Sequence, residues 1–188
     1  MTQTMKIKTK RLLLRPLELK DAESIAENAN NLNVSKWLLT MPYPYSLRSA
    51  KSWISKSGKK KKQKPRKDYS FGIELREEKR IIGGVGLHKV DRYQGRGEVG
   101  YWLGEKYWRK GYGSEALEAI INLAFNRLKL RKLEAGVFAG NPSSGKLLES
   151  FGFKQEGYKR EACRCKANDK ICNEYIYGLL KREYKPKR

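Results

Sequence analysis

The sequence lacks any apolar run that approaches the ~20 residues needed to span a bilayer. It also lacks a secretory signal, because Met1 to Lys10 has no apolar core. Cysteine is scarce, and the odd number of three residues is typical of a reducing compartment. These absences predict a cytoplasmic protein with no membrane partner.

Metal ligands are equally few. Cys163, Cys165 and Cys172 fall one short of the four ligands that a structural zinc site takes, so we expect ordinary thiols and no metal. His88 is the only histidine, and it falls within a predicted strand. Because the sequence identifies no partner for it, we interpret His88 as a strand residue and not as a catalytic base.

Acidic residues are outnumbered, with 20 Asp and Glu against 42 Lys and Arg, and the net charge is +22. Such an excess predicts attraction to polyanions, including contact with RNA or the ribosome. The alternative is a general lysine enrichment of the source organism. Residues 59–67 hold seven basic side chains in nine. They predict a mobile, solvated loop, or else a contact with nucleic acid or an acidic partner.

The 188 residues fit a single domain, 1–188. The pattern predicts a strand, helices, three strands, a helix, a strand, a helix and two strands, which is a mixed α/β domain. Asp21 is expected to cap an early helix, and Gly58 to end the helix that Ser46 begins. Tight spacing predicts an antiparallel meander over 69–75, 81–90 and 98–103, and a closing hairpin of 153–166 with 171–180.

Two turns are candidates for phosphate binding. Residues 108–113 connect a strand to an amphipathic helix and contain Gly111 and Gly113, an arrangement that offers backbone N–H groups to an anion or simply caps the helix. Residues 140–147 match the P-loop pattern G-x-x-x-x-G-K. A P-loop then needs Ser or Thr, and the residue here is Leu147, so a nucleotide hydrolase is disfavoured.

Several motifs in order along the chain carry a family resemblance. Gly111 and Gly113 occupy the two small positions of the signature Q/R-x-x-G-x-G/A, with Trp108 in the Gln/Arg position. Further matching stretches are 9–16, 98–103, 114–117, 141–144, 148–153 and 174–180. The chain resembles the GNAT superfamily of acetyltransferases, and most closely its branch of ribosomal-protein N-terminal alanine or serine acetyltransferases.

The resemblance implies an acyl-CoA N-acyltransferase fold, with a mostly antiparallel sheet of about seven strands flanked by helices. It implies acetyl-CoA as cosubstrate and no metal. The residues expected to bind the coenzyme are Tyr101, Trp102, Leu103, Trp108, Arg109, Lys110, Gly111, Tyr112, Gly113, Ser114, Asn141 and Ser144.

Acetyl transfer to an amine needs a proton acceptor and a donor to the leaving thiolate. Glu98 is the candidate acceptor, directly or through water, and its alternative is a solvated charge on the strand. Ser144 is the candidate donor, and its alternative is a serine that satisfies backbone groups at a helix start. Tyr43 and Tyr45 are candidate substrate contacts or packing residues, and Tyr158 and Tyr175 are weaker candidates.

The resemblance favours transfer of acetyl to a protein N-terminal amine, with a protein or peptide as partner and a monomer or homodimer as the assembly. One alternative is a small amine such as a polyamine or aminoglycoside, although a surface of charge +22 repels polycations. The other is a basic module that binds RNA or the ribosome and does not catalyse.

Overall fold

The computed structural model describes residues 5–186, except the side chains of Lys61 and Lys62. The described strands form one eight-stranded sheet in the order β1-β2-β3-β4-β5-β6-β8-β7. The strands are β1 (Ile7–Lys8), β2 (Leu12–Arg15), β3 (Tyr69–Leu75), β4 (Arg80–Asp91), β5 (Arg96–Leu103), β6 (Lys132–Phe138), β7 (Lys154–Arg164) and β8 (Ile171–Leu180). Neighbouring strands are antiparallel except β5 and β6, which are parallel.

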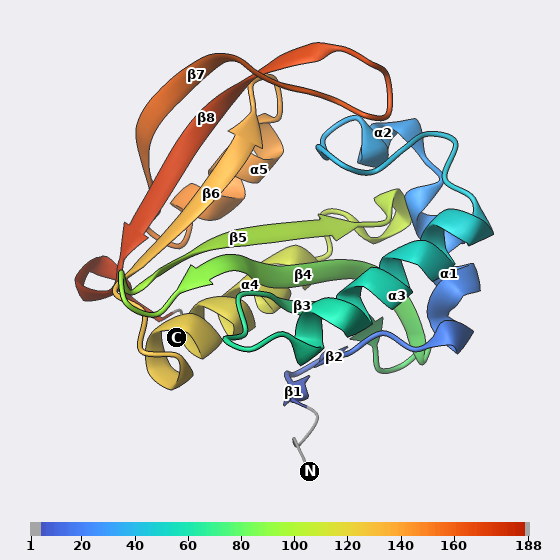
Figure 1. Ribbon diagram of the computed structural model, residues 1–188, viewed down its shortest axis with the longest axis horizontal. Helices are drawn as coiled ribbons and strands as arrows, with labels where there is room; N and C mark the ends of the chain where they lie inside the picture. The colour runs from blue at the N-terminus through green and yellow to red at the C-terminus, as the bar shows by residue number, and fades with distance from the viewer. Residues whose placement is uncertain (1–4, 187–188) are drawn as a thin grey trace.

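Helices cover both faces of this sheet (Figure 1). They are α1 (Ala22–Ala29), α2 (Leu32–Ser35), α3 (Leu47–Lys62), α4 (Tyr112–Asn122), extended by a π-helical turn (Leu123–Arg127), and α5 (Pro142–Glu149). The larger core lies between the sheet, α4 and α5, and a smaller core lies beneath α1 and α3. Within residues 5–186, no helix combines the length and apolar character needed to cross a membrane.

The mixed α/β class, the β3-β4-β5 meander and the β7-β8 hairpin are confirmed. The sheet has one strand more than expected because the first predicted strand is broken in two. At the break the Thr9 N–H donates to Leu12 O at 3.0 Å, and the Leu12 N–H donates to the Thr9 hydroxyl at 3.1 Å. This tight turn reverses the chain and pairs β1 with β2.

The prediction that Gly58 ends its helix is wrong. Helix α3 continues to Lys62, and Gly58 is absent from the residues with positive φ. A Cβ at Gly58 would meet nothing within 4 Å, so this glycine lies on an open face and keeps helical geometry. The first four residues of the predicted basic loop 59–67 are therefore helical, and the chain becomes extended at Gln63.

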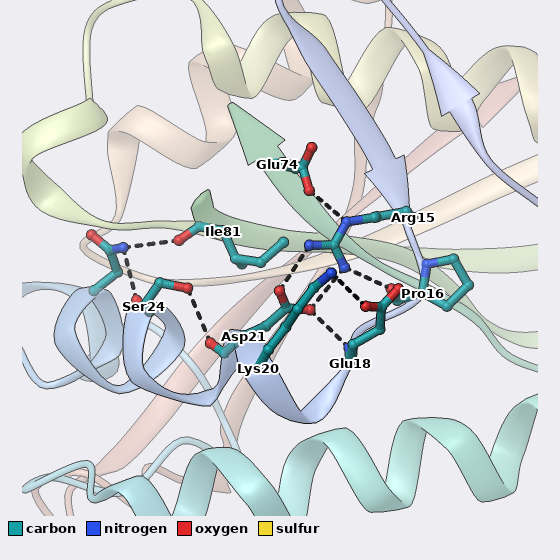
Figure 2. Close-up of polar contacts among 9 residues, drawn as sticks. Arg15, Pro16, Glu18, Lys20, Asp21, Ser24, Glu74 and Ile81 are labelled. Carbon is teal, nitrogen blue, oxygen red and sulfur yellow. Dashed lines mark hydrogen bonds and ion pairs between the residues drawn. The ribbon is translucent and has the colours of Figure 1, made fainter. Parts of the chain in front are cut away.

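A buried ion-pair network attaches α1 to the sheet (Figure 2). The Arg15 guanidinium donates to both carboxylate oxygens of Asp21 at 2.8 Å and to Glu74 at 2.5 Å. Hydrogen bonding to Asp21 outweighs the cost of burial and raises the pKa of Arg15. Asp21 is the N-cap residue of α1, as predicted, but its side chain makes no capping hydrogen bond, because its carboxylate accepts from Arg15 and from the Glu18 N–H instead.

Candidate active site

The two neighbours of β5 hold it very differently. β4 pairs with β5 from His88–Glu98 to Gly83–Leu103, whereas β6 pairs only with Arg96, Gly97 and Glu98. Figure 1 shows β6, β8 and β7 turning away from β5 beyond this point. A gap therefore opens in the sheet beside the second half of β5.

Backbone alternation decides which groups of β5 face this gap. The Gly104 N–H donates to Ile82 O of β4 at 2.9 Å, so by the alternation of antiparallel pairs the amides of Trp102 and Gly100 also point to β4. The backbone groups of Tyr101 then point toward the gap. The Trp102 side chain lies on the face of the sheet that α1 and α3 cover, where its ring centre lies 5.9 Å from that of Trp53.

The start of α4 lies at the end of β5, as the signature predicts. Gly111 is the N-cap residue with φ 79°, a left-handed conformation that favours glycine. The first amides of a helix have no partners within the helix, and its dipole favours an anion there. The Trp108 indole donates to Leu103 O at 2.9 Å and ties the turn to β5.

The other residues predicted for this turn lie at the surface or half-buried. Arg109, Lys110 and Gly111 are exposed, and Tyr112, Gly113 and Ser114 are half-buried. A Cβ at Gly113 would contact Leu103 and Leu147 at 3.4 and 3.5 Å, so this glycine lies between β5 and α5. The predicted phosphate turn is thus assembled with its basic side chains outward.

Arg11 is a member of this turn that the sequence analysis missed. Its guanidinium donates to Lys110 O at 2.8 Å and lies 4.4 Å from the centre of the Tyr112 ring. Glu115 accepts from its Nε at 2.8 Å and from its backbone N–H at 2.7 Å. The stretch Thr9–Arg11 belonged to the family resemblance and was the available signal. Its contacts, Lys110 and Glu115, lie about a hundred residues later in the chain, where a local pattern does not reach.

The predicted proton donor, Ser144, lies across the gap at the start of α5. Asn141 caps this helix by accepting from the Ser144 N–H at 3.3 Å. The Ser144 hydroxyl lies 2.8 Å from the Tyr101 hydroxyl, so the two form a hydrogen-bonded pair. Burial raises the pKa of Tyr101 to about 12, against the opposing hydrogen bond from Ser144. Both groups therefore hold their protons at neutral pH.

Glu98 lies where β5 and β6 begin to separate, opposite Glu134 of β6. Its carboxylate accepts from Lys89 Nζ at 2.9 Å, and its side chain is 41% exposed. The hydrogen bond to Glu98 raises the pKa of Lys89 against a smaller effect of burial. The Glu98 carboxylate therefore already binds one ammonium group, that of Lys89.

The tyrosines predicted to contact substrate have separate environments. Tyr43 is exposed, whereas Tyr45 packs in the core beneath α1 and α3, where burial raises its pKa to about 12. Tyr45 is therefore a packing residue, the alternative that the sequence left open. The rings of Tyr158 and Tyr175 lie 5.0 Å apart on the hairpin, and Tyr158 is exposed.

A cavity of about 560 Å³ lies between the hairpin, α3 and the segment that follows α2. Three cations and one acid are among its lining residues, which are Leu39, Thr40, Lys56, Arg164, Lys166 and Asp169. The Lys166 N–H donates to Leu39 O at 3.3 Å, and Cys165 is fully buried, with its sulfur 3.5 Å from Lys36 O. Among the described residues no cluster could hold a metal ion, and all three cysteines are free.

The comparisons with known proteins agree with this geometry. The family model described as "Acetyltransferase (GNAT) domain" matches residues 11–154. "Uncharacterized N-acetyltransferase p20" of Bacillus licheniformis is 34% identical over 182 residues, which cover 94% of this chain and 96% of the relative. The "[Ribosomal protein uS5]-alanine N-acetyltransferase" of Escherichia coli is 33% identical over 94 residues, which cover 50% and 48%.

The fold also matches solved structures. One is "Mycobacterium smegmatis RimJ in complex with CoA-disulfide", with a TM-score of 0.83 at 19% identity over 96% of this chain and 90% of that one. At that identity the likeness concerns the fold alone. The family model covers well over half of this chain, and the relative p20 exceeds 30% identity over nearly all of it. The chain therefore belongs to the GNAT family of acetyltransferases and is an N-acetyltransferase.

Proposed function

We propose that this enzyme transfers the acetyl group of acetyl-CoA to the N-terminal amine of a protein. The observation that carries the proposal is the gap after Glu98 between β5 and β6, bordered by the glycine-headed start of α4. The ribosomal-protein acetyltransferase among the relatives supports the acceptor class.

The residues around the gap fit acetyl-CoA. The α4 amides with Arg11, Arg109 and Lys110 suit its phosphates, because a helix start and cations both favour anions. The Tyr101 C=O suits the amide-bearing arm, because this edge of β5 pairs with no described strand after Glu98 and can form strand-like hydrogen bonds. When bound, acetyl-CoA supplies an activated acyl carbon as a thioester.

The transfer forms one N–C bond and breaks one C–S bond, so the enzyme must take a proton from the amine and supply one to the sulfur. Glu98 attracts the ammonium and lies where the proton leaves, directly or through water. The Ser144–Tyr101 hydroxyl pair lies across the gap as the proton donor. The Tyr101 N–H stabilises negative charge on the acyl oxygen.

The acceptor approaches from the side of α3 and the hairpin. Lys56, Arg164 and Lys166 line the cavity there and favour peptides that carry acidic side chains. The exposed ring of Tyr43 is a further candidate contact for the peptide. A polyamine would meet these cations and be repelled.

The test has two steps. Calorimetry should show that acetyl-CoA binds, and mass spectrometry of a peptide library should then find the acetyl group on N-terminal amines, with acidic peptides preferred. Acetylation of polyamines with no peptide product would replace the proposed acceptor with a small amine. Failure to bind acetyl-CoA, with RNA binding that survives Gly111→Ala, would favour the non-catalytic module.

A further inference from the structure

His88 lies in a row of three polar side chains that come from adjacent strands. Asp68 immediately precedes β3, His88 lies on β4, and Glu98 is its direct register partner on β5. Their chain neighbours Tyr69, Leu87 and Val99 all belong to the core on the α4 side. The row therefore lies on the opposite face, the face from which the acceptor approaches.

Asp68 fixes the orientation of the imidazole. His88 Nδ1 lies 2.9 Å from Asp68 Oδ1, and Lys60 Nζ of α3 lies 3.3 Å from the same oxygen. Burial opposes the charge of Asp68, but the hydrogen bond from His88 and the charge of Lys60 together lower the pKa of this carboxyl. An ionised Asp68 accepts only, so neutral His88 carries its proton on Nδ1 and presents a lone pair at Nε2.

The free edge of the ring lies over β5 beside the gap. Cδ2 and Nε2 each lie 3.4 Å from the point where a Cβ of Gly100 would be. Gly100 precedes Tyr101, whose backbone groups face the gap. The His88 side chain is 38% exposed, and no described residue makes a hydrogen bond to Nε2. A basic nitrogen is thus held open, next to the carboxylate of Glu98.

We propose that His88 is a catalytic residue whose Nε2 takes the proton from the acceptor amine, directly or through one water, while Glu98 binds the ammonium and Asp68 acts as the positioning residue. This inference rests on the proposed function and divides between two residues the role given there to Glu98. One N–H bond of the bound ammonium breaks, an Nε2–H bond forms, and His88 later returns this proton to solvent. The neutral amine then forms the N–C bond, the sulfur receives a proton from the Ser144–Tyr101 pair as the C–S bond breaks, and the second proton that the nitrogen loses restores this pair.

The chemistry of the two groups favours this division. A neutral imidazole nitrogen is a stronger base than a carboxylate oxygen, and histidine is the side chain that most often acts as a general base. Glu98 holds the Lys89 ammonium at 2.9 Å, which is the contact that an acceptor ammonium would replace. The charged groups around His88 and this ion pair, which all influence any pH dependence, are Lys60, Asp68, Lys89, Glu98, Glu134 and Glu174.

The first test uses the free protein. Because His88 is the only histidine, the imidazole region of a ¹H–¹⁵N NMR spectrum contains a single ring. We expect the neutral ring to be the Nδ1–H tautomer, and Asp68→Asn to shift the population toward Nε2–H. A wild-type ring protonated mainly on Nε2 would overturn the proposal without any activity measurement.

The second test is kinetic. His88→Gln should lower kcat/KM for the acceptor about 100-fold, leave acetyl-CoA affinity unchanged, and flatten the pH profile of kcat/KM. Asp68→Asn should lower kcat/KM about 10-fold, below the full effect of general-base loss, and Glu98→Gln should chiefly raise the acceptor KM. The matched control is Asp91→Asn, also on β4, whose carboxylate accepts from the Gln94 N–H in the β4–β5 turn.

The outcomes separate this inference from the proposed function. Full kcat/KM and an unchanged pH profile in His88→Gln would overturn the role of His88 and leave the acetyltransferase function intact. A wild-type protein that binds acetyl-CoA but acetylates no amine would overturn the function, and the role of His88 with it.

Discussion

The two edges of β5 have opposite properties. Toward β4 the strand is paired along most of its length, and glycines allow the two backbones to lie close together, since a Cβ at Gly83 would clash with Trp102 O. Toward β6 it is paired over three residues, and no described strand pairs with the rest of this edge. The closed edge fixes the strand in place, and the open edge offers its backbone groups to a ligand.

The sheet is held rigidly before the gap and more loosely after it. The half before the gap is fixed by the buried Arg15–Asp21–Glu74 network and by the core beneath α1 and α3. The half after it is connected to the first through the short β5–β6 pairing and through the hairpin, whose Cys165 lies buried against the segment that follows α2. Side chains from both halves therefore meet beside one gap, as the Tyr101 and Ser144 hydroxyls do.

Disrupting the ion-pair network in the half of the sheet before the gap should have the largest effect, a loss in the free energy of unfolding. Asp21→Ala removes the two hydrogen bonds that its carboxylate accepts from the buried Arg15 guanidinium and leaves Glu74 as the remaining ion-pair partner. Removal of one partner of a buried ion pair costs about 3–5 kcal/mol, and the remaining Glu74 contact places the expected loss at about 3 kcal/mol. Both side chains are less than 8% exposed. Urea unfolding should show this loss, whereas Glu23→Ala, on the exposed face of the same helix, should unfold close to wild type. A small loss in Asp21→Ala would show that the network does not hold α1.

Removing the proposed proton donor, Ser144, tests the open edge next. Ser144→Ala should lower kcat about 100-fold, in the range for loss of a general acid, with acetyl-CoA affinity nearly unchanged. Tyr101→Phe should have a similar effect, and the double variant should fall little further, because the two hydroxyls act as a pair. Ser150→Ala, at the far end of α5, is the matched control. Additive losses in the double variant would contradict a shared role.

Substitution of Gly111 should weaken coenzyme binding. Its φ of 79° strains any other residue, and a Cβ would lie 3.2 Å from the Arg11 guanidinium. We expect Gly111→Ala to reduce acetyl-CoA affinity about 10-fold, or about 1.4 kcal/mol, as measured by calorimetry. Gly58→Ala is the matched control, and in its open helical position it should raise stability by about 0.5–1 kcal/mol. Unchanged affinity in Gly111→Ala would remove this turn from the coenzyme site.

The smallest effect concerns the free energy of unfolding at alkaline pH. Burial raises the pKa of Tyr45 to about 12 in the folded protein, so above pH ~10 the unfolded chain loses a proton that the folded protein keeps. Stability should therefore fall as pH rises from about 10 to about 12. In Tyr45→Phe this fall should be shallower in urea titrations, and Tyr93→Phe, at a side chain 94% exposed, should follow wild type. An equal fall of stability with pH in the wild type and both variants would show that Tyr45 is accessible to solvent.

Local patterns in the sequence predicted the start of α4, the meander and the hairpin, because periodicity and turn residues act over a few positions. They did not predict that Gly58 stays helical, because only the open space around it shows that nothing there ends the helix. They also missed the contacts of Arg11 with Lys110 and of His88 with Asp68, which depend on strand register across 20 or more residues. The parallel β5–β6 pairing and its early end are equally invisible to local pattern.

The most direct test of the gap is amide hydrogen exchange at Tyr101, measured by NMR with and without saturating acetyl-CoA. The amides of Gly100 and Trp102 point to β4 and serve as internal references on the same strand. We predict that acetyl-CoA slows exchange at Tyr101 by at least about 10-fold, which corresponds to about 1.4 kcal/mol, and changes its two neighbours much less. Equal exchange at Tyr101 in the free and the saturated protein would contradict the assignment of the β5–β6 gap as the coenzyme site.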